Sequence, residues 1–354
     1  MWANNRVTQS LEIEWPIFQA PMGEYTTPQL AASVSNSGGL GALGMWGFSA
    51  REAEARIQGF RELSEGPLNV NYPLWPDPGE LANRSLPMRA AIQKLYDEKG
   101  LGPVPAPGAS AGEVSPQHLE VLISNQPEVV SFHFGLPDED IVQALKSANI
   151  RLMCSATTVA EAKYLEANGV DMIIAQGIEA GGHRGTFLGS DVSAQSGLFS
   201  LLPQVVDAVK IPVIAAGGIA DGRGIAAALM LGASGVLVGT AFLRCAEAGV
   251  TEAQRIAYAN AAEASTVLTD VMSGRNARSI RTRLIAELAQ PELEPLPFPA
   301  QYSWTLPFEQ ANDEDFLELF AGQSIALTRE MPAAELVRTL VDETNTCLES
   351  RSMR

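Results

Sequence analysis

Eight short apolar segments recur along the chain, and each is followed by a stretch in which apolar residues have helical spacing. Several of these segments are apolar throughout instead of alternating, as expected of parallel strands that are covered on both faces. Eight strands that alternate with helices fit a closed (β/α)8 barrel better than an open doubly wound sheet. The predicted strands are residues 16–22, 39–44, 68–74, 129–135, 151–156, 171–177, 211–218 and 235–240.

The segments between the strands predict helices, and two longer stretches depart from this rhythm. We expect helices at residues 28–37, 49–63, 138–148, 158–168, 197–209 and 222–231, and a last one at 332–348 that closes the outer ring. Residues 77–117 are interpreted as a long connection after the third strand. Residues 246–320 combine an Ala- and Glu-rich helical stretch, a basic run and a Pro-rich passage. We therefore predict a barrel of residues 1–245 and 321–354 with a small, mostly helical cap at 246–320.

The charge balance narrows the function classes. The chain of 354 residues has 41 acidic and 24 basic residues, a net charge of −17, with no long run of Lys and Arg. A general affinity for nucleic acid or an anionic membrane is therefore not expected. The three cysteines are far apart and predict neither a disulfide framework nor a zinc site. No apolar run is long enough for a membrane span, so we expect a cytoplasmic protein. We also expect no bound metal.

Glycines at the ends of the last two predicted strands indicate a phosphate site. Active sites of (β/α)8 barrels lie at the carboxyl ends of the strands, and the loops after strands seven and eight often bind phosphate. Gly217 and Gly218 end the seventh segment, and Gly239 and Thr240 end the eighth. Glycine lets backbone N–H groups approach phosphate oxygens, and the predicted helix at 222–231 offers an N-terminus nearby. The alternative is that these glycines only allow tight turns; we favour a phosphate, carried by a cofactor or a substrate.

Two histidines lie at the same predicted rim. His183 stands between glycine pairs in a loop after the sixth strand, where its side chain is free to reach a site and transfer protons near neutral pH. His133 ends the fourth strand; it either points into the barrel mouth or is a core histidine, and we favour the first. Gln176 ends the sixth strand. Its side chain either hydrogen-bonds to the edge of a bound heterocycle or makes hydrogen bonds within the barrel rim.

Four other polar residues are assigned structural roles. Arg184 and Glu179 are expected to hold the shape of the loop around His183. His118 is placed on an outer helix, and Cys154, which has no basic neighbour in the sequence, is interpreted as a buried thiol.

Four stretches in this order make the chain similar to the nitronate monooxygenase family, formerly called 2-nitropropane dioxygenases, and to its class I branch in particular. They are PIFQAPMGEYTTPQLAASVSNSGGLGALG, VVSFHFGLP, CSATTVAEAKYLEANGVDMIIAQGIEAGGHRGTF and IPVIAAGGIADGRGIAAALMLGASGVLVGTAFL. The resemblance covers most of residues 16–243 and resumes at 321–324. It implies an FMN-dependent barrel.

The resemblance also implies roles for particular residues. The flavin phosphate would be held by Gly217, Gly218, Gly239 and Thr240, and the isoalloxazine ring lined by Pro21, Met22 and Gly23. Further cofactor contacts would come from Asn71, Gln176, Gly181 and Gln323. His183 falls on the family's proposed catalytic base or substrate-orienting histidine, and His133 is the second active-site candidate.

The implied reaction is oxidation of alkyl nitronates, such as propionate 3-nitronate, or of nitroalkanes, with O2 to carbonyl compounds and nitrite through a flavosemiquinone. Gly23-Glu24-Tyr25 departs from the small-residue run of many family members, which leaves the substrate open. Two alternatives stay open: an FMN-dependent NAD(P)H:quinone or enoyl reductase of the same fold, and a barrel that binds a phosphate ligand without redox turnover. We expect a small-molecule enzyme that is a monomer or a homodimer.

Overall fold

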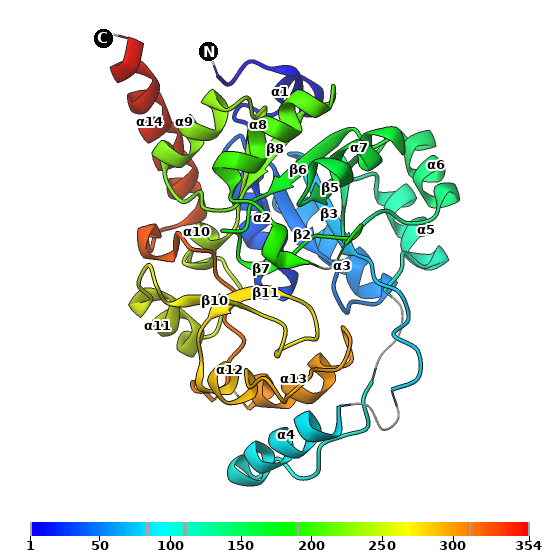
Figure 1. Cartoon of the computed structure of the whole chain (residues 1–354). Coiled ribbons are helices and arrows are strands. Elements are labelled where there is room, and N and C mark those ends of the chain that lie inside the picture. The colour runs from blue at the N-terminus through cyan, green and yellow to red at the C-terminus, as the bar shows by residue number, and fades with distance from the viewer. Residues whose placement is uncertain (1, 82–84, 109–111, 190, 312, 353–354) are drawn as a thin grey trace.

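Eight parallel strands form one sheet in the computed structural model of the chain, which describes residues 2–81, 85–108, 112–189, 191–311 and 313–352. The strand order is β1-β9-β8-β6-β5-β4-β3-β2, and a parallel bridge between Phe18 and Leu40 joins the two outer strands. Each strand lies within one of the eight predicted segments, so the (β/α)8 barrel is confirmed (Figure 1). The strands are β1 (Ile17–Gln19), β2 (Gly41–Gly44), β3 (Leu68–Pro73), β4 (Val129–His133), β5 (Arg151–Ala156), β6 (Met172–Gln176), β8 (Val213–Ala216) and β9 (Gly235–Val238).

Helices surround the barrel and begin at residues suited to helix N-termini. Thr27 accepts a hydrogen bond from the backbone N–H of Leu30 with Pro28 in the first turn, and Ser49 forms a capping box with Glu52. The last helix packs against α9 and α2 and completes the outer ring, as predicted. The outer helices are α2 (Pro28–Ser35), α3 (Ala50–Arg61), α5 (Pro116–Asn125), α6 (Glu139–Ser147), α7 (Val159–Ala167), α8 (Leu198–Ala208), α9 (Gly222–Met230), the short α10 (Thr240–Leu243) and α14 (Ala333–Ser352).

One end of the barrel interior is filled with apolar side chains. Phe18, Val129 and Met172, each near the start of its strand, form a buried cluster. Helix α1 (Arg6–Leu11) adds Val7 and Leu11 to this cluster and covers the same end. The interior is therefore packed at the amino ends of the strands, which leaves their carboxyl ends for a site.

The segment that we predicted to form a cap, residues 246–320, contains strands as well as helices. It consists of α11 (Glu252–Asn260), β10 (Thr266–Thr269), β11 (Ala277–Ile280), α12 (Arg283–Leu288) and α13 (Tyr302–Gln310). Strands β10 and β11 form an antiparallel hairpin, and β11 also pairs with β7 (Gly182–His183), which leaves the barrel after β6. The sequence did not reveal this sheet. It ties the predicted histidine loop directly to the cap.

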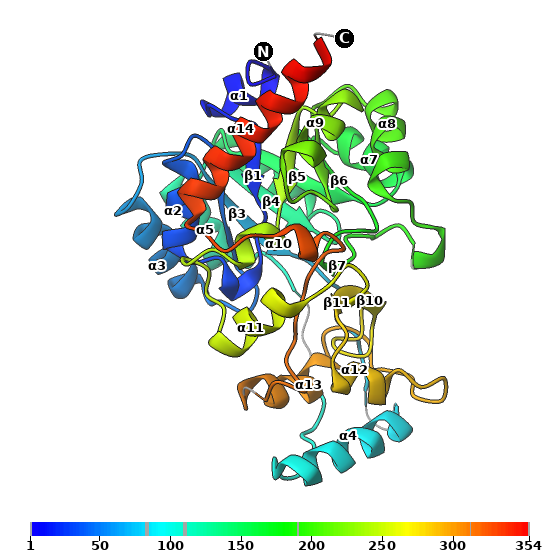
Figure 2. The same ribbon diagram turned by 90° about the vertical axis from the view of Figure 1, so that its left-hand side faces the viewer.

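Helix α4 (Leu86–Lys99) belongs to the stretch that we expected to be only a connection. It packs against α12 and α13 in a hydrophobic cluster that includes Tyr96, Leu284 and Trp304, and both views place it beside the cap (Figure 2). Residues 82–84 and 109–111 of that connection lie outside the described residues. We propose that α4 and residues 246–320 form one cap unit. Among the described helices, none is apolar over a length that could cross a membrane.

Candidate active site

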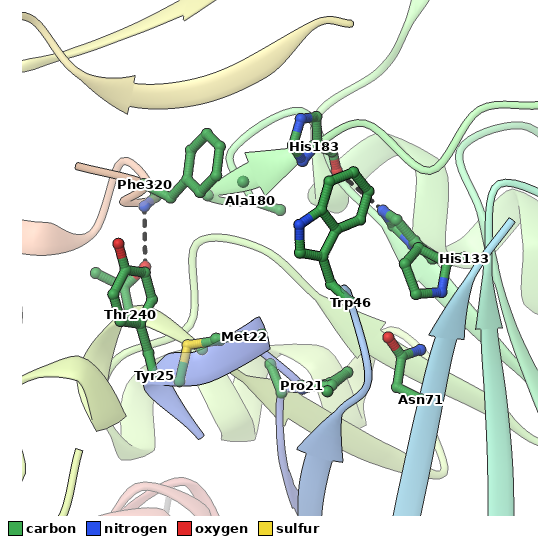
Figure 3. Close-up of a pocket in the computed structure, with 18 of the residues that line it drawn as sticks. Pro21, Met22, Tyr25, Trp46, Asn71, His133, Ala180, His183, Thr240 and Phe320 are labelled. Carbon is green, nitrogen blue, oxygen red and sulfur yellow. Dashed lines mark hydrogen bonds between the residues drawn. The ribbon is translucent and has the colours of Figure 1, made fainter. Parts of the chain in front are cut away.

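A cavity of about 510 Å³ lies at the carboxyl ends of the strands, between the barrel and the cap (Figure 3). All the predicted site residues line it except Gln323, which is exposed and whose backbone N–H donates to the Glu179 carbonyl oxygen at 3.0 Å. Its neighbours Gly322 and Ser324 line the cavity instead. The lining members of the predicted set are Pro21, Met22, Gly23, Asn71, His133, Gln176, Gly181, His183, Gly217, Gly218, Gly239 and Thr240.

The glycine rim presents unpaired hydrogen-bond donors. No described residue accepts a hydrogen bond from the backbone N–H groups of Gly218, Gly239 or Thr240. The Thr240 hydroxyl oxygen accepts from the Gly322 backbone N–H at 2.9 Å (dashed line in Figure 3), so its O–H is left to donate. Within the described residues no Lys or Arg lines the cavity. An anion at this rim would therefore be held by backbone amides and a hydroxyl.

The helix that we expected to assist the phosphate is already capped. Asp221 accepts from the backbone N–H groups of Arg223 and Gly224, and Glu343 accepts from that of Gly222 at 3.0 Å. Carboxylates thus occupy the N-terminus of α9, and the expectation that it would help hold a phosphate was wrong. The free donors come from the start of α10 and from the loop after β8.

The loop after β6 is held by the side chains that we assigned to that role. Arg184 is fully buried and its guanidinium donates to the carbonyl oxygens of Gly177 and Gln176 at 2.7 and 2.8 Å. The Glu179 carboxylate accepts from the backbone N–H of Leu198 at the start of α8. Gln176 donates to the His183 carbonyl oxygen at 3.0 Å and accepts from the Gly185 N–H at 2.8 Å, so its carboxamide mainly shapes this loop.

Buried Glu161 on α7 anchors the far end of the same loop. Its carboxylate accepts hydrogen bonds from the backbone N–H groups of Thr157, Phe187 and Leu188 at 2.7, 2.6 and 3.1 Å. Burial raises the pKa of Glu161, but these hydrogen bonds outweigh it and leave the pKa below its usual value.

Replacement of this carboxylate by an amide, Glu161→Gln, is expected to reduce the free energy of unfolding by about 2–4 kcal/mol at pH 7, because the amide NH2 group then faces N–H donors. Since the folded-state pKa is lowered, the contribution of Glu161 exists above its unfolded-state pKa and is lost as the pH falls through the folded-state value. Urea unfolding of both proteins between pH 3 and 7 measures this, and the difference between them should shrink in acid. Exposed Glu120→Gln is the control; an equally small effect at both positions would contradict the assigned role.

His183 sits in an aromatic pocket between barrel and cap. Its ring lies 5.1 Å from that of Phe298 and 5.0 Å from that of Phe320. The Ser273 hydroxyl donates to the Arg275 carbonyl oxygen, so its oxygen accepts from His183 Nε2–H at 2.8 Å. Nδ1 bonds to no described residue. Burial, then the charge of Arg275, lowers the pKa of His183 to about 3, so the imidazole is neutral at neutral pH.

His133 has both ring nitrogens engaged. Nε2–H donates to the His183 carbonyl oxygen at 3.1 Å, and Nδ1 therefore accepts from the Ser155 hydroxyl at 2.9 Å. Burial is the main cause that lowers its pKa to about 4. His133 reaches the barrel mouth as predicted, but its bonds orient the backbone of His183.

Asn71 has one free acceptor at the rim of β3. Its NH2 group donates to Ser131 Oγ at 3.0 Å and to the Ser131 carbonyl oxygen at 3.2 Å. The carboxamide oxygen accepts no hydrogen bond from a described residue and faces the cavity in Figure 3. It is available to an N–H group of a ligand.

Sequence analysis missed several lining residues. Ser273, Phe298 and Phe320 come from the cap and carry no local signal for the site. Trp46 lies two residues after β2, so the rule that selected the other rim residues could have found it. Of two aromatic residues on α13, Tyr302 lines the cavity, whereas Trp304 is buried and donates its indole N–H to the Pro105 carbonyl oxygen at 3.1 Å.

The residues assigned structural roles keep them. His118 bonds through its two ring nitrogens to Ser115 Oγ and the Phe48 carbonyl oxygen, on α5 outside the cavity. Cys154 is fully buried, and burial raises the pKa of its thiol well above the usual range.

Comparisons with known proteins agree with this geometry. The sequence profile of the family "Nitronate monooxygenase" matches residues 4–343. A nitronate monooxygenase of Pseudomonas aeruginosa is 43% identical over 350 residues, 96% of this chain and 99% of that protein. A probable nitronate monooxygenase of Staphylococcus aureus is 39% identical over 354 residues, 99% of each chain.

Two solved structures have the same fold over nearly the whole chain. Nitroalkane oxidase from Streptomyces ansochromogenes superposes with a TM-score of 0.90 at 36% identity, covering 98% of this chain and 99% of that one. FabK from Thermotoga maritima superposes with a TM-score of 0.77 at 28% identity, covering 99% and 98%. With full-length relatives at this identity and a profile match over almost all residues, this chain belongs to the nitronate monooxygenase family and is an oxidoreductase.

Proposed function

We propose that the chain is an FMN-dependent nitronate monooxygenase that converts alkyl nitronates and O2 to carbonyl compounds and nitrite. The observation that carries this proposal is that one cavity holds both a rim of unpaired backbone N–H groups and a neutral, partly buried histidine with a free ring nitrogen. The names of the relatives support the same reaction.

The lining residues fit FMN. The N–H groups of Gly218, Gly239 and Thr240, with the Thr240 hydroxyl, would hold its phosphate. Pro21 and Met22 would lie along the ring system, and the free carboxamide oxygen of Asn71 would accept from a ring N–H. When bound, FMN supplies the acceptor for substrate electrons and their transfer to O2.

The pair of His183 and Ser273 would handle the reacting end of the substrate. With Nε2–H donating to Ser273, the Nδ1 lone pair can take a proton from the carbon of a nitroalkane. If the Ser273 hydroxyl turns to donate to Nε2, the proton resides on Nδ1, which then donates to a nitronate oxygen. The low pKa of His183 makes the imidazole a weak base, so we expect nitronates, which arrive deprotonated, to be the better substrates.

The remaining lining groups would position and protect the substrate. His133 holds the backbone of His183 through the bond to its carbonyl oxygen. Trp46, Phe298 and Phe320 give the cavity an apolar wall that limits water near the reacting carbon.

Anaerobic mixing tests this function. We expect an alkyl nitronate to change the visible absorption of the purified flavoprotein within the time of one turnover, and NADH or NADPH to do so at least about a hundredfold more slowly. Stopped-flow absorbance measures each rate, and nitrite release in air confirms the product. Fast reduction by NADH or NADPH would favour the reductase alternative, and protein that releases no FMN on denaturation would exclude both redox functions.

A further inference from the structure

Where the loop after β1 meets the cap, the cavity carries carboxyl groups and phenols that the proposed reaction does not use. We call this region the carboxyl–phenol pocket; it is lined by Glu24, Tyr25, Tyr302, Glu309 and Glu318. Since no Lys or Arg of the described residues lines the cavity, the carboxylates there have no cationic partner in the wall. The potential in this region therefore favours a positive ligand group.

Glu309 is fixed at the centre of the pocket. The Tyr25 hydroxyl donates to its Oε1 and the Tyr302 hydroxyl to its Oε2, both at 3.1 Å. Gln254 in turn donates to the Tyr25 oxygen at 2.9 Å. The two phenols orient the carboxylate while leaving further acceptor positions on both of its oxygens.

Glu318 lacks the partners that a buried carboxyl normally has. Its side chain is 7% exposed, and Oε1 is buried without a hydrogen-bond partner among the described residues. Burial, and then the charges of Glu309 and Glu24, raise the pKa of Glu318 well above its usual value. An unpaired buried carboxyl costs free energy, and this cost is recovered when a ligand donates to it.

A metal ion does not fit this arrangement. Over the described residues, no group of three or more His, Cys, Asp or Glu side chains is placed to hold one. An organic group with several N–H hydrogens would supply the donors that these carboxyl oxygens lack, and an alkylammonium has three.

We propose that the carboxyl–phenol pocket binds an ammonium group at the end of the substrate opposite the nitro carbon, so that the preferred substrates are amino-substituted alkyl nitronates. This inference rests on the proposed function. An ammonium at the other end of a nitronate balances the negative charge of the nitronate. It also stabilises the ionised forms of Glu309 and Glu318, whose pKa values burial raises. A carboxylate in the same place would add a second negative charge, so nitronates such as propionate 3-nitronate are disfavoured.

Three nitronates of matched chain length test the preference: those of 3-nitropropylammonium, 1-nitrobutane and 4-nitrobutanoate. With the holoenzyme we expect kcat/KM, measured by nitrite release, to fall at least about tenfold from the ammonium to the neutral compound and about tenfold again to the carboxylate. Isothermal titration with n-butylammonium and with butyrate measures binding without turnover, and only the ammonium should bind. Equal kcat/KM values, or butyrate binding as tight as n-butylammonium, would overturn the proposal.

Variants assign the preference to the pocket. Glu318→Gln and, separately, Glu309→Gln should each lower the ratio of kcat/KM for the ammonium compound to that for the neutral one at least tenfold. Glu314→Gln is the matched control, an exposed glutamate in the same segment, and should keep the wild-type ratio. If Glu318→Gln does not fold, Glu309→Gln and the titrations still test whether the ammonium group binds in this pocket. An unchanged kcat/KM ratio in Glu309→Gln would show that it does not.

The same measurements separate the two proposals. Turnover of the 1-nitrobutane nitronate without an ammonium preference would leave the nitronate monooxygenase function standing and remove only the ammonium site. If no nitronate is oxidised, the proposed function fails, and n-butylammonium binding that is lost in Glu309→Gln still supports the site.

Discussion

Replacement of His183 by Asn is expected to lower kcat/KM for a neutral nitroalkane by about 10²–10⁴-fold while the protein keeps its FMN. The carboxamide of Asn has no lone pair basic enough to take a proton from carbon, but its NH2 group can still donate to a nitro oxygen. The loss on the corresponding nitronate should therefore be smaller, by at least about tenfold. Nitrite release with both forms of one substrate, together with the flavin content from absorbance, measures the effect.

His118→Asn is the matched control, because His118 lies on α5 outside the cavity. It should leave both kcat/KM values and the flavin content unchanged. Equal losses on nitroalkane and nitronate in His183→Asn would assign the residue to general positioning instead of proton transfer. Unchanged turnover would return it to a structural role.

The barrel and its rim could be predicted because their signals are local. Each strand is an apolar segment bounded by turn residues, and the barrel rule then brings together residues that follow different strands. Asn71, His133 and Gln176 are far apart in sequence, yet all line the cavity. The loop roles of Arg184 and Glu179 followed from their neighbours in the chain.

The cap could not be predicted in detail because its packing depends on distant contacts. Strand β7 has only two residues, too few to show a period of two, and it pairs with β11 about 95 positions later in the chain. The Tyr96 hydroxyl of α4 donates to the Trp304 carbonyl oxygen at 2.8 Å, a contact that joins two different segments of the chain. Ser273 and Phe298 reach the cavity only through such contacts.

One error and one omission of the sequence analysis have simple physical causes. Asp221 precedes α9 and is a strong N-cap residue, so the sequence already held the sign that this helix end would be capped by the chain itself. Glu318 lies in the acidic run DEDFLE, which reads as a solvated surface, but its apolar neighbours Phe316, Leu317 and Leu319 are buried and take it into the interior. In both cases the role of a carboxyl group depends on the residues that surround it in the folded chain.

Gly239→Asp is expected to weaken FMN binding by at least about 100-fold, which corresponds to about 2.7 kcal/mol. Gly239 has a φ of −109°, which other residues adopt readily, and an added Cβ would meet Ala20 Cβ at 3.4 Å and Met22 Sδ at 3.8 Å, both ordinary contacts. The fold therefore tolerates a side chain here. An aspartate would place a carboxylate beside the free N–H groups of Gly239 and Thr240, where it competes with the phosphate and repels it.

Gly239→Ala and Gly239→Asn separate charge from size. Ala adds only the tolerated Cβ and should lower the affinity for FMN less than about tenfold. Asn has the shape of Asp without its charge, so the FMN affinity of Gly239→Asn should lie between those of the Ala and Asp variants. Fluorescence titration of the apoproteins with FMN measures the dissociation constants, and thermal unfolding checks that all three variants fold. If Gly239→Asp bound FMN as tightly as Gly239→Asn, the phosphate would have to lie elsewhere. Since no Lys or Arg of the described residues lines the cavity, this rim of amides is the part of the site on which the whole flavin assignment depends.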